Sequence, residues 1–197
     1  AVYQDHVLVP YHLIETSTKI ADDGLTYEKL DEEEREQYED EFCEDDGLVD
    51  HIPPEKINTY IFNRDTVDIM ISDLMNHGIK HKNGNHVGKT IIFAQNKRHA
   101  KYIIERFDVL YPQYKGAFCK LVVCDEPYAE KNLEDFKKPD EYPFITVTVD
   151  MLETGVDVPE ITNLVFAKKV YSRIKFEQMI GRGTRLCENL FGEGCAE

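Results

Sequence analysis

Alternating apolar and polar positions mark the second half of the chain. Ile145, Val147 and Val149 alternate with threonines, which is the period-two pattern of a β-strand. A second apolar run, residues 161–167, follows after a segment that contains Gly155. Strand, glycine loop and strand predict a parallel α/β sheet with a ligand site at the carboxyl ends of its strands.

Apolar residues spaced at i, i+3, i+4 and i+7 predict amphipathic helices between further strands. Residues 91–94 and 118–124 are β-rich runs. The helical stripes are Val67, Met70, Ile71 and Leu74; Ala100, Ile103, Ile104 and Phe107; and Ala129, Leu133 and Phe136. We expect His77 and Gly78 to end the first helix and Asn96 to cap the second. This alternation of strands and helices predicts a mainly parallel sheet flanked by helices.

A further helix is predicted to begin after Ser172, a residue type that caps helices. Its apolar side would consist of Ile174, Phe176, Met179 and Ile180. The helix is expected to fray across Gly181–Gly183, which leaves Arg182 and Arg185 on a glycine-loosened end. Guanidinium groups match phosphate oxygens through paired hydrogen bonds, so this end suits an anionic ligand.

The net charge of −15 is concentrated at the start of the chain. Residues 1–56 hold 18 acidic and 4 basic side chains, whereas residues 57–197 hold 20 acidic and 19 basic ones. We therefore place a domain boundary at Pro53-Pro54, between an acidic segment, 1–56, and a charge-balanced domain, 57–197. The acidic segment is a solvated helix and loop or an acidic interaction arm, and it is not expected to hold DNA.

Five cysteines without a CxxC pair favour a reducing cytoplasm over a disulfide framework or a zinc site. No apolar run approaches 18 residues, so no membrane span is predicted. Three histidines, His77, His81 and His86, lie close together without cysteine or carboxylate at ligand spacing, and no metal is expected there.

Two stretches resemble nucleotide-binding motifs but lack features that those motifs require. Residues 84–90, GNHVGKT, have three residues between the glycines where a phosphate loop needs four, and they precede a strand instead of following one. Asp125-Glu126 follows an apolar strand as a magnesium-binding carboxylate would, but no phosphate loop accompanies it. We therefore interpret Lys89 as a strand residue and Asp125-Glu126 as the end of a strand.

The segments TGVDVP (154–159) and QMIGRGTR (178–185) resemble motifs V and VI of superfamily 2 helicases and translocases. The longer stretch 149–186 is similar to the restriction (R) subunit of type I restriction enzymes, which are DNA-translocating ATPases. The resemblance covers roughly residues 88–192. It implies a three-layer α/β/α RecA-like lobe, the second of two, with residues 1–56 as the connection between the lobes.

The resemblance also implies roles for individual residues. Arg182 and Arg185 would reach the γ-phosphate of ATP, with Arg185 the first choice as arginine finger. Gly155 and Asp157 would lie against the nucleotide, and Gln178 would couple ATP to the opposite lobe. The residues implied at the DNA backbone are Thr154, Gln95 and Lys97. ATP and Mg²⁺ would act in the complete two-lobe enzyme, and the first lobe would supply the phosphate loop and the Mg²⁺ ligand.

The partners implied are duplex DNA, the first lobe of the same parent chain, and the methylation and specificity subunits of a restriction complex. Two other functions stay open. The lobe would belong to a DNA- or RNA-unwinding helicase without a nuclease, or it would be a non-catalytic scaffold that binds proteins through the acidic segment. The chain is expected to be a fragment of a longer protein and to be inactive alone.

Overall fold

The structure is a computed structural model that describes residues 10–14, 25–26, 35, 51–52, 63–124, 126–149, 158–185, 187 and 190. Within 1–56 it shows one antiparallel pair, β1 (Leu25–Thr26) with β2 (His51–Ile52). Most of the acidic segment, the predicted boundary at Pro53-Pro54, and Thr154, Gly155 and Asp157 lie outside the described residues.

Four parallel strands form the centre of the lobe. They are β3 (Lys89–Ala94), β4 (Cys119–Leu121), β5 (Ile145–Thr148) and β6 (Ile161–Ala167), in the order β4-β5-β3-β6. All three neighbouring pairs are parallel, which confirms the predicted parallel α/β sheet. Strand β3 therefore lies inside the sheet, and all six of its residues are buried.

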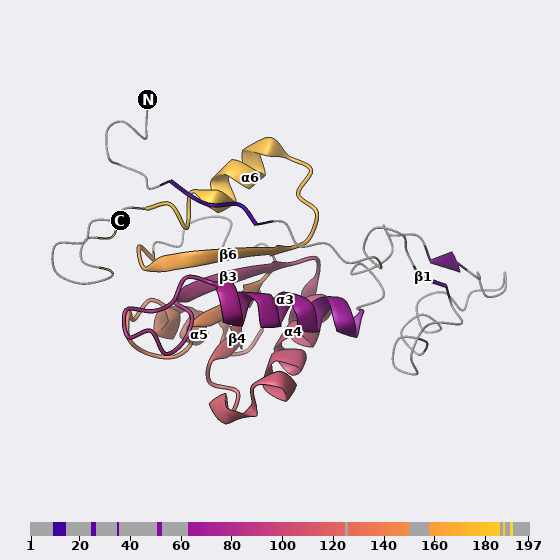
Figure 1. The fold of residues 1–197 in the computed structure, drawn as a ribbon, viewed down its shortest axis with the longest axis horizontal. Coiled ribbons are helices and arrows are strands. Elements are labelled where there is room, and N and C mark those ends of the chain that lie inside the picture. The colour runs from indigo at the N-terminus through magenta and orange to yellow at the C-terminus, as the bar shows by residue number, and fades with distance from the viewer. Residues whose placement is uncertain are drawn as a thin grey trace.

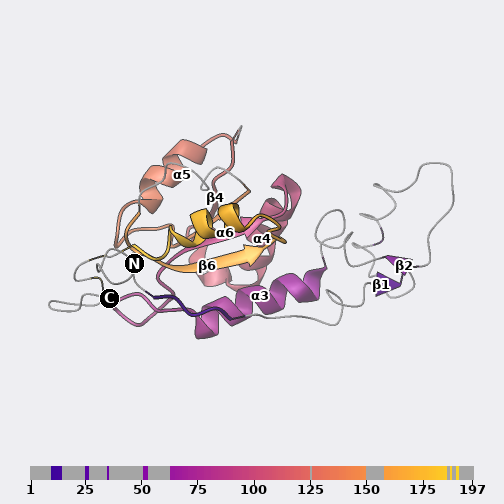
Figure 2. The same cartoon turned by 90° about the horizontal axis from the view of Figure 1, so that it is seen from above.

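Helices cover both faces of this sheet, as Figures 1 and 2 show. On one face, α3 (Arg64–His77) and α4 (Lys97–Leu110) pack on a core that includes Ile92 and Val147. On the other face, α5 (Ala129–Phe136) and α6 (Arg173–Ile180) pack on a core that includes Ile91 and Phe93. A 3₁₀ turn, η2 (Pro112–Tyr114), follows α4. The lobe therefore has the three layers expected of a RecA-like fold.

Side-chain caps fix where three of the helices begin. The amide oxygen of Asn63 accepts from the backbone of Thr66 at 2.9 Å, and Asn96 accepts from His99 at 2.8 Å. Ser172 caps α6 more loosely, at 3.4 Å from the nitrogen of Lys175. The starts predicted at Asn96 and Ser172 are thereby confirmed.

Two sequence predictions need correction. Strand β4 covers only three residues of the predicted strand 118–124, because it lies at the edge of the described sheet and pairs there with β5 alone. Ile174, placed on the apolar side of α6, is 70% exposed, whereas Met179 and Ile180 are buried. The first turn of α6 is exposed, whereas Phe176 contacts Phe166 of β6 and Met179 packs in the core.

The parallel strands give the sheet two chemically different edges. We call the edge at which β3, β5 and β6 end, marked by Gln95, Val149 and Lys168, the carboxyl edge. The opposite edge, where Gly88 and Glu160 lead into β3 and β6, is the amino edge. Ala94 pairs with Ala167, so the segments that leave β3 and β6 begin side by side.

Candidate functional site: two edges of one sheet

The motif arginines lie near the amino edge. Helix α6 follows the connection that leaves the carboxyl end of β6, and it runs back along that strand (Figure 1). At its end, a Cβ on Gly183 would lie 3.0 Å from Cγ of Leu164 and 3.7 Å from a methyl group of Ile161, in the first half of β6. The flanking Arg182 and Arg185 therefore lie away from the carboxyl ends of the strands, where the sequence had predicted the ligand site.

The glycine-rich end of α6 is a tight turn instead of a frayed helix. The amides of Gly181, Arg182 and Gly183 donate to Glu177, Met179 and Ile180 at 2.9, 3.1 and 2.9 Å. Thr184 is buried, and its hydroxyl donates to the carbonyl of Ile180 at 3.3 Å. These bonds continue the backbone path beyond the last helical residue, so the two half-buried arginines project from a fixed turn.

An apolar cluster links this turn to the loop before β6. Val158, 2% exposed, packs with Ile161 and with Met179 of α6. Val158 is the covalent neighbour of Asp157, one of the residues predicted to contact a nucleotide. Gln178, the third residue in that group, is exposed on α6.

The carboxyl edge holds the residues predicted to contact nucleic acid. Gln95 is exposed, and its backbone N–H donates to Nδ1 of His99 at 3.3 Å. Lys97 and Lys101 both bind the carboxylate of Glu126, at 2.9 and 2.8 Å. Hydrogen bonds from these two lysines lower the pKa of Glu126. The structure therefore places Gln95 and Lys97 together, on the edge opposite the motif arginines.

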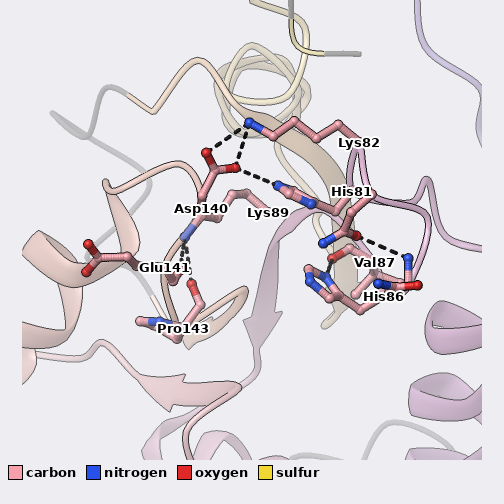
Figure 3. A network of polar contacts seen from close by, with 10 residues as sticks. His81, Lys82, His86, Val87, Lys89, Asp140, Glu141 and Pro143 are labelled. Carbon is pink, nitrogen blue, oxygen red and sulfur yellow. Dashed lines mark hydrogen bonds and ion pairs between the residues drawn. The ribbon is translucent and has the colours of Figure 1, made fainter. Parts of the chain in front are cut away.

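Lys89 and Glu126 belong to the two stretches that resemble nucleotide-binding motifs, and both have structural partners within the lobe. Glu126 is engaged by the lysines of α4. Lys89 opens β3, is 2% exposed, and donates to the carbonyl oxygens of Glu141 and Pro143, both at 2.8 Å (Figure 3). Its ammonium also lies 4.6 Å from the ring centre of Phe144. The sequence excluded a phosphate-loop role for Lys89 but gave no sign of this anchoring role.

Burial and neighbouring carboxylates shift the pKa of Lys89 in opposite directions. Removal from water is the larger effect and lowers the pKa of Lys89 to about 8, while Glu160, Asp140 and Glu141 raise it in part. Lys89 lines a cavity of about 180 Å³ at the amino edge, together with Asp140, Glu160 and Cys187. The cavity thus lies close to the turn that carries Arg185.

A polar network closes one side of this cavity. His81 Nε2 lies 3.0 Å from Asp140, and Lys82 binds the same carboxylate at 2.8 Å (Figure 3). The rings of His86 and His81 are stacked with their centres 5.1 Å apart. Nδ1 of His86 lies 2.8 Å from the carbonyl oxygen of Val87. In the described part of the chain, no group of three histidine, cysteine or acidic side chains is arranged to hold a metal ion. No described helix is long and apolar enough to cross a membrane.

Comparison with known proteins places this geometry in a family. Over 107 residues, half of the chain, it is 43% identical to the type I restriction enzyme EcoKI endonuclease subunit of Escherichia coli (strain K12). It is 31% identical over 111 residues, 54% of the chain, to the EcoAI endonuclease subunit of Escherichia coli. These matches cover only 9% and 14% of the two relatives.

A solved structure agrees with the sequence relatives. It is a fragment described as an HsdR subunit of a type I restriction enzyme from Vibrio vulnificus YJ016. It matches with a TM-score of 0.54 and 26% identity, over 66% of this chain and 27% of the other. The family model described as "Helicase conserved C-terminal domain" matches residues 66–187, which include β3 to β6, α6 and both motif arginines. The chain therefore belongs to the helicase conserved C-terminal domain family and is related to the R subunits of type I restriction enzymes.

Proposed function

We propose that this chain is the second motor lobe of an ATP-dependent double-stranded DNA translocase in a type I restriction endonuclease. The observation that carries the proposal is the placement of Arg182 and Arg185 on a hydrogen-bonded turn, held against β6 by Gly183 and Leu164. Such a turn presents guanidinium groups in a fixed direction, which is what recognition of a phosphate requires.

The amino edge would face ATP. ATP would be shared with a first lobe, and its hydrolysis would drive movement along DNA. Arg182 and Arg185 would bind the terminal phosphate, and Arg185 would neutralise charge as the transferred group departs. Gly155 and Asp157 would lie against the nucleotide, and Gln178 would contact the first lobe. The packing of Val158 beneath α6 supports this assignment, because it joins the Asp157 loop to the turn of the arginines.

The carboxyl edge would face the DNA backbone. Gln95 and Lys97, with Thr154 from the loop after β5, would contact phosphates without reading sequence. Lys97 would exchange its ion pair with Glu126 for a phosphate oxygen. This exchange costs little free energy because exposed ion pairs contribute little to stability, and the side chain of Lys97 is 43% exposed.

The remaining parts would come from the parent protein. The first lobe would supply the phosphate loop and the ligands of Mg²⁺, since Lys89 is committed to backbone carbonyls here. Residues 1–56 would connect the two lobes, and residues 57–197 would form the second lobe. Methylation and specificity subunits would choose the DNA site.

The test is ATP hydrolysis by the intact parent protein with and without duplex DNA. We expect DNA to stimulate the wild type, and Arg185→Ala to lower the stimulated rate by about 10³-fold or more while the protein stays folded. Arg64→Ala is the matched control, because Arg64 is a half-exposed arginine at the start of α3, far from the motif turn in sequence.

Three results would contradict the proposal. Hydrolysis at the wild-type rate in Arg185→Ala would remove this arginine from the ATP site. ATP hydrolysis at a rate independent of duplex DNA would exclude a duplex-DNA translocase, and no hydrolysis by the wild type would favour the non-catalytic scaffold.

A further inference from the structure

The segment that joins β6 to α6 is an exposed, basic and aromatic stretch to which the proposed function gives no role. It reads KKVYSRIK, from Lys168 to Lys175, with four cations and no carboxylate. Tyr171 is 89% exposed, the most exposed of the large hydrophobic side chains in the described part of the chain. Ile174 is 70% exposed, so two large apolar side chains lie exposed within this basic stretch.

The sheet register brings this segment to the predicted DNA contacts. Ala94 and Ala167 are paired at the ends of β3 and β6, so Gln95 and Lys168 leave neighbouring strands at the same level. Nζ of Lys168 also donates to the carbonyl oxygen of Val149 at 2.8 Å, which fixes the start of the segment against the end of β5. Three strand ends are thereby joined at one edge.

Charge is distributed unequally between the two edges. Residues 95–101 and 168–175 together contain seven cations and no carboxylate, in a chain with a net charge of −15. Those cations are Lys97, Arg98, Lys101, Lys168, Lys169, Arg173 and Lys175. Two carboxylates outside these ranges, Glu126 and Glu177, pair with three of these cations, which leaves an excess of positive charge at this edge. At the amino edge, the two lysines Lys82 and Lys138 are paired with three carboxylates, Asp140, Asp135 and Glu141. The carboxyl edge is therefore where the described lobe can attract a polyanion.

The ion pair at the start of α6 does not prevent Arg173 from binding a polyanion. Nε of Arg173 binds the carboxylate of Glu177 at 2.8 Å, but the two side chains are 90% and 61% exposed. An exposed pair of this kind on one helix contributes only a few tenths of a kcal/mol, because water screens it. Arg173 can therefore exchange Glu177 for a phosphate oxygen at low cost.

We propose that Lys169, Tyr171 and Arg173 form a phosphate-binding strip for duplex DNA, continuous with Gln95 and Lys97. Lys169 and Arg173 bind phosphate oxygens, and the hydroxyl of Tyr171 donates to a third. This inference rests on the proposed function, and it adds a DNA contact outside the helicase motifs. The strip is sequence-independent because its contacts are made to the backbone.

The test is duplex-DNA binding by the intact parent protein at several salt concentrations. Removal of one cation from a phosphate lowers the steepness of log Kobs against log [salt] by about 0.9, so Lys169→Gln with Arg173→Gln should reduce the slope by about 1.8. Lys115→Gln removes one charge from an exposed lysine that precedes β4 at the amino edge; it is the control for loss of a surface cation elsewhere and should keep the wild-type slope.

Tyr171→Phe separates hydrogen bonding from charge. It should weaken DNA binding about fivefold, the equivalent of one hydrogen bond, while the salt slope stays at the wild-type value. The double variant and Tyr171→Phe alter only exposed side chains. The melting temperature of each variant should therefore stay within about one degree of the wild type.

The outcomes separate this inference from the function on which it rests. If the wild type binds duplex DNA and the double variant keeps its slope, the strip is excluded and the motor lobe stands. If the double variant keeps its DNA affinity but fails to assemble with the partner subunits, the segment is a protein interface and the strip is again excluded. A wild type without DNA binding overturns both proposals.

Discussion

At the scale of single residues, His99 is a buried group on which the predicted DNA contact depends. It is 1% exposed in α4, and its Nδ1 accepts from the backbone of Gln95. Burial lowers the pKa of His99 to about 4, because a charged imidazole would lose its water. A proton on Nδ1 would also remove the acceptor that holds Gln95.

This geometry predicts acid sensitivity. In the unfolded chain His99 takes a proton near pH 6.5, while in the fold it stays neutral until about pH 4, so stability falls as pH decreases through this window. Between pH 7 and pH 5, the wild type should lose about 2 kcal/mol of unfolding free energy relative to His99→Gln. Urea denaturation of both proteins at the two pH values measures the difference, and equal losses would contradict the buried neutral state.

Sequence patterns predicted some of the residue-level features and missed others. Helix caps such as Asn96 and Ser172 were predictable, because capping depends on one side chain and a backbone amide three residues away. The environment of Lys89 was not, since its partners Glu141 and Pro143 lie more than 50 residues along the chain. Ile174 was assigned to the wrong side of α6, because periodicity does not show which turns of a helix are buried.

At the scale of elements, Gly88, the residue before β3, lies directly against Thr162 of β6. A Cβ on this glycine would lie 2.4 Å from Oγ1 of Thr162, which is too close for any real contact. The Thr162 hydroxyl also accepts from Nδ2 of Asn163 at 3.0 Å, so it cannot turn away without losing a hydrogen bond. Gly88 is thus required by the neighbouring strand and not by a phosphate.

Gly88→Ala should destabilise the fold by about 1–3 kcal/mol, the usual cost of overpacking. Thr162→Ala removes the opposing hydroxyl, so the double variant should be more stable than the sum of the single changes predicts, by about 1 kcal/mol. Thermal or urea unfolding of the four proteins gives this coupling energy. Additive effects would show that the two side chains are not in conflict.

The order of the elements in space was less accessible from sequence than their positions along the chain. Sequence patterns predicted β3, β5, β6, part of β4 and the four helices α3 to α6, with a parallel arrangement. The arrangement β4-β5-β3-β6 depends on pairings between distant segments, such as Ile92 with Val147 and with Val165. The same limitation applies to the position of the motif arginines, since it depends on α6 running back along β6.

At the scale of the whole molecule, the described residues include the two arginines that the proposed function assigns to ATP but no phosphate loop. Its arginines project from a fixed turn, but its Gly-Lys-Thr sequence leads into a strand and its lysine is buried. The relatives are much longer than the matched region, which is 9% and 14% of their length. We infer that catalysis is completed by other parts of the parent.

The isolated 197-residue chain should therefore hydrolyse ATP at no more than the background rate, with or without duplex DNA. A steady-state phosphate-release assay on the purified chain measures this directly. The control is the parent protein in the same assay. Multiple turnovers by the isolated chain that disappear in Lys89→Ala would show that Lys89 serves a phosphate after all, and would contradict the shared site.

The course of α6 back along β6 has a mechanical consequence. Its eight residues span about 12 Å, beginning beside Tyr171 and ending at the turn of Arg182. A short helix packed on a strand is stiff, so a pull on its first turn reaches its last turn almost unchanged. On the proposed function, tension in the DNA would be transmitted along this helix to the arginines, and the rate of ATP turnover would depend on the opposing load.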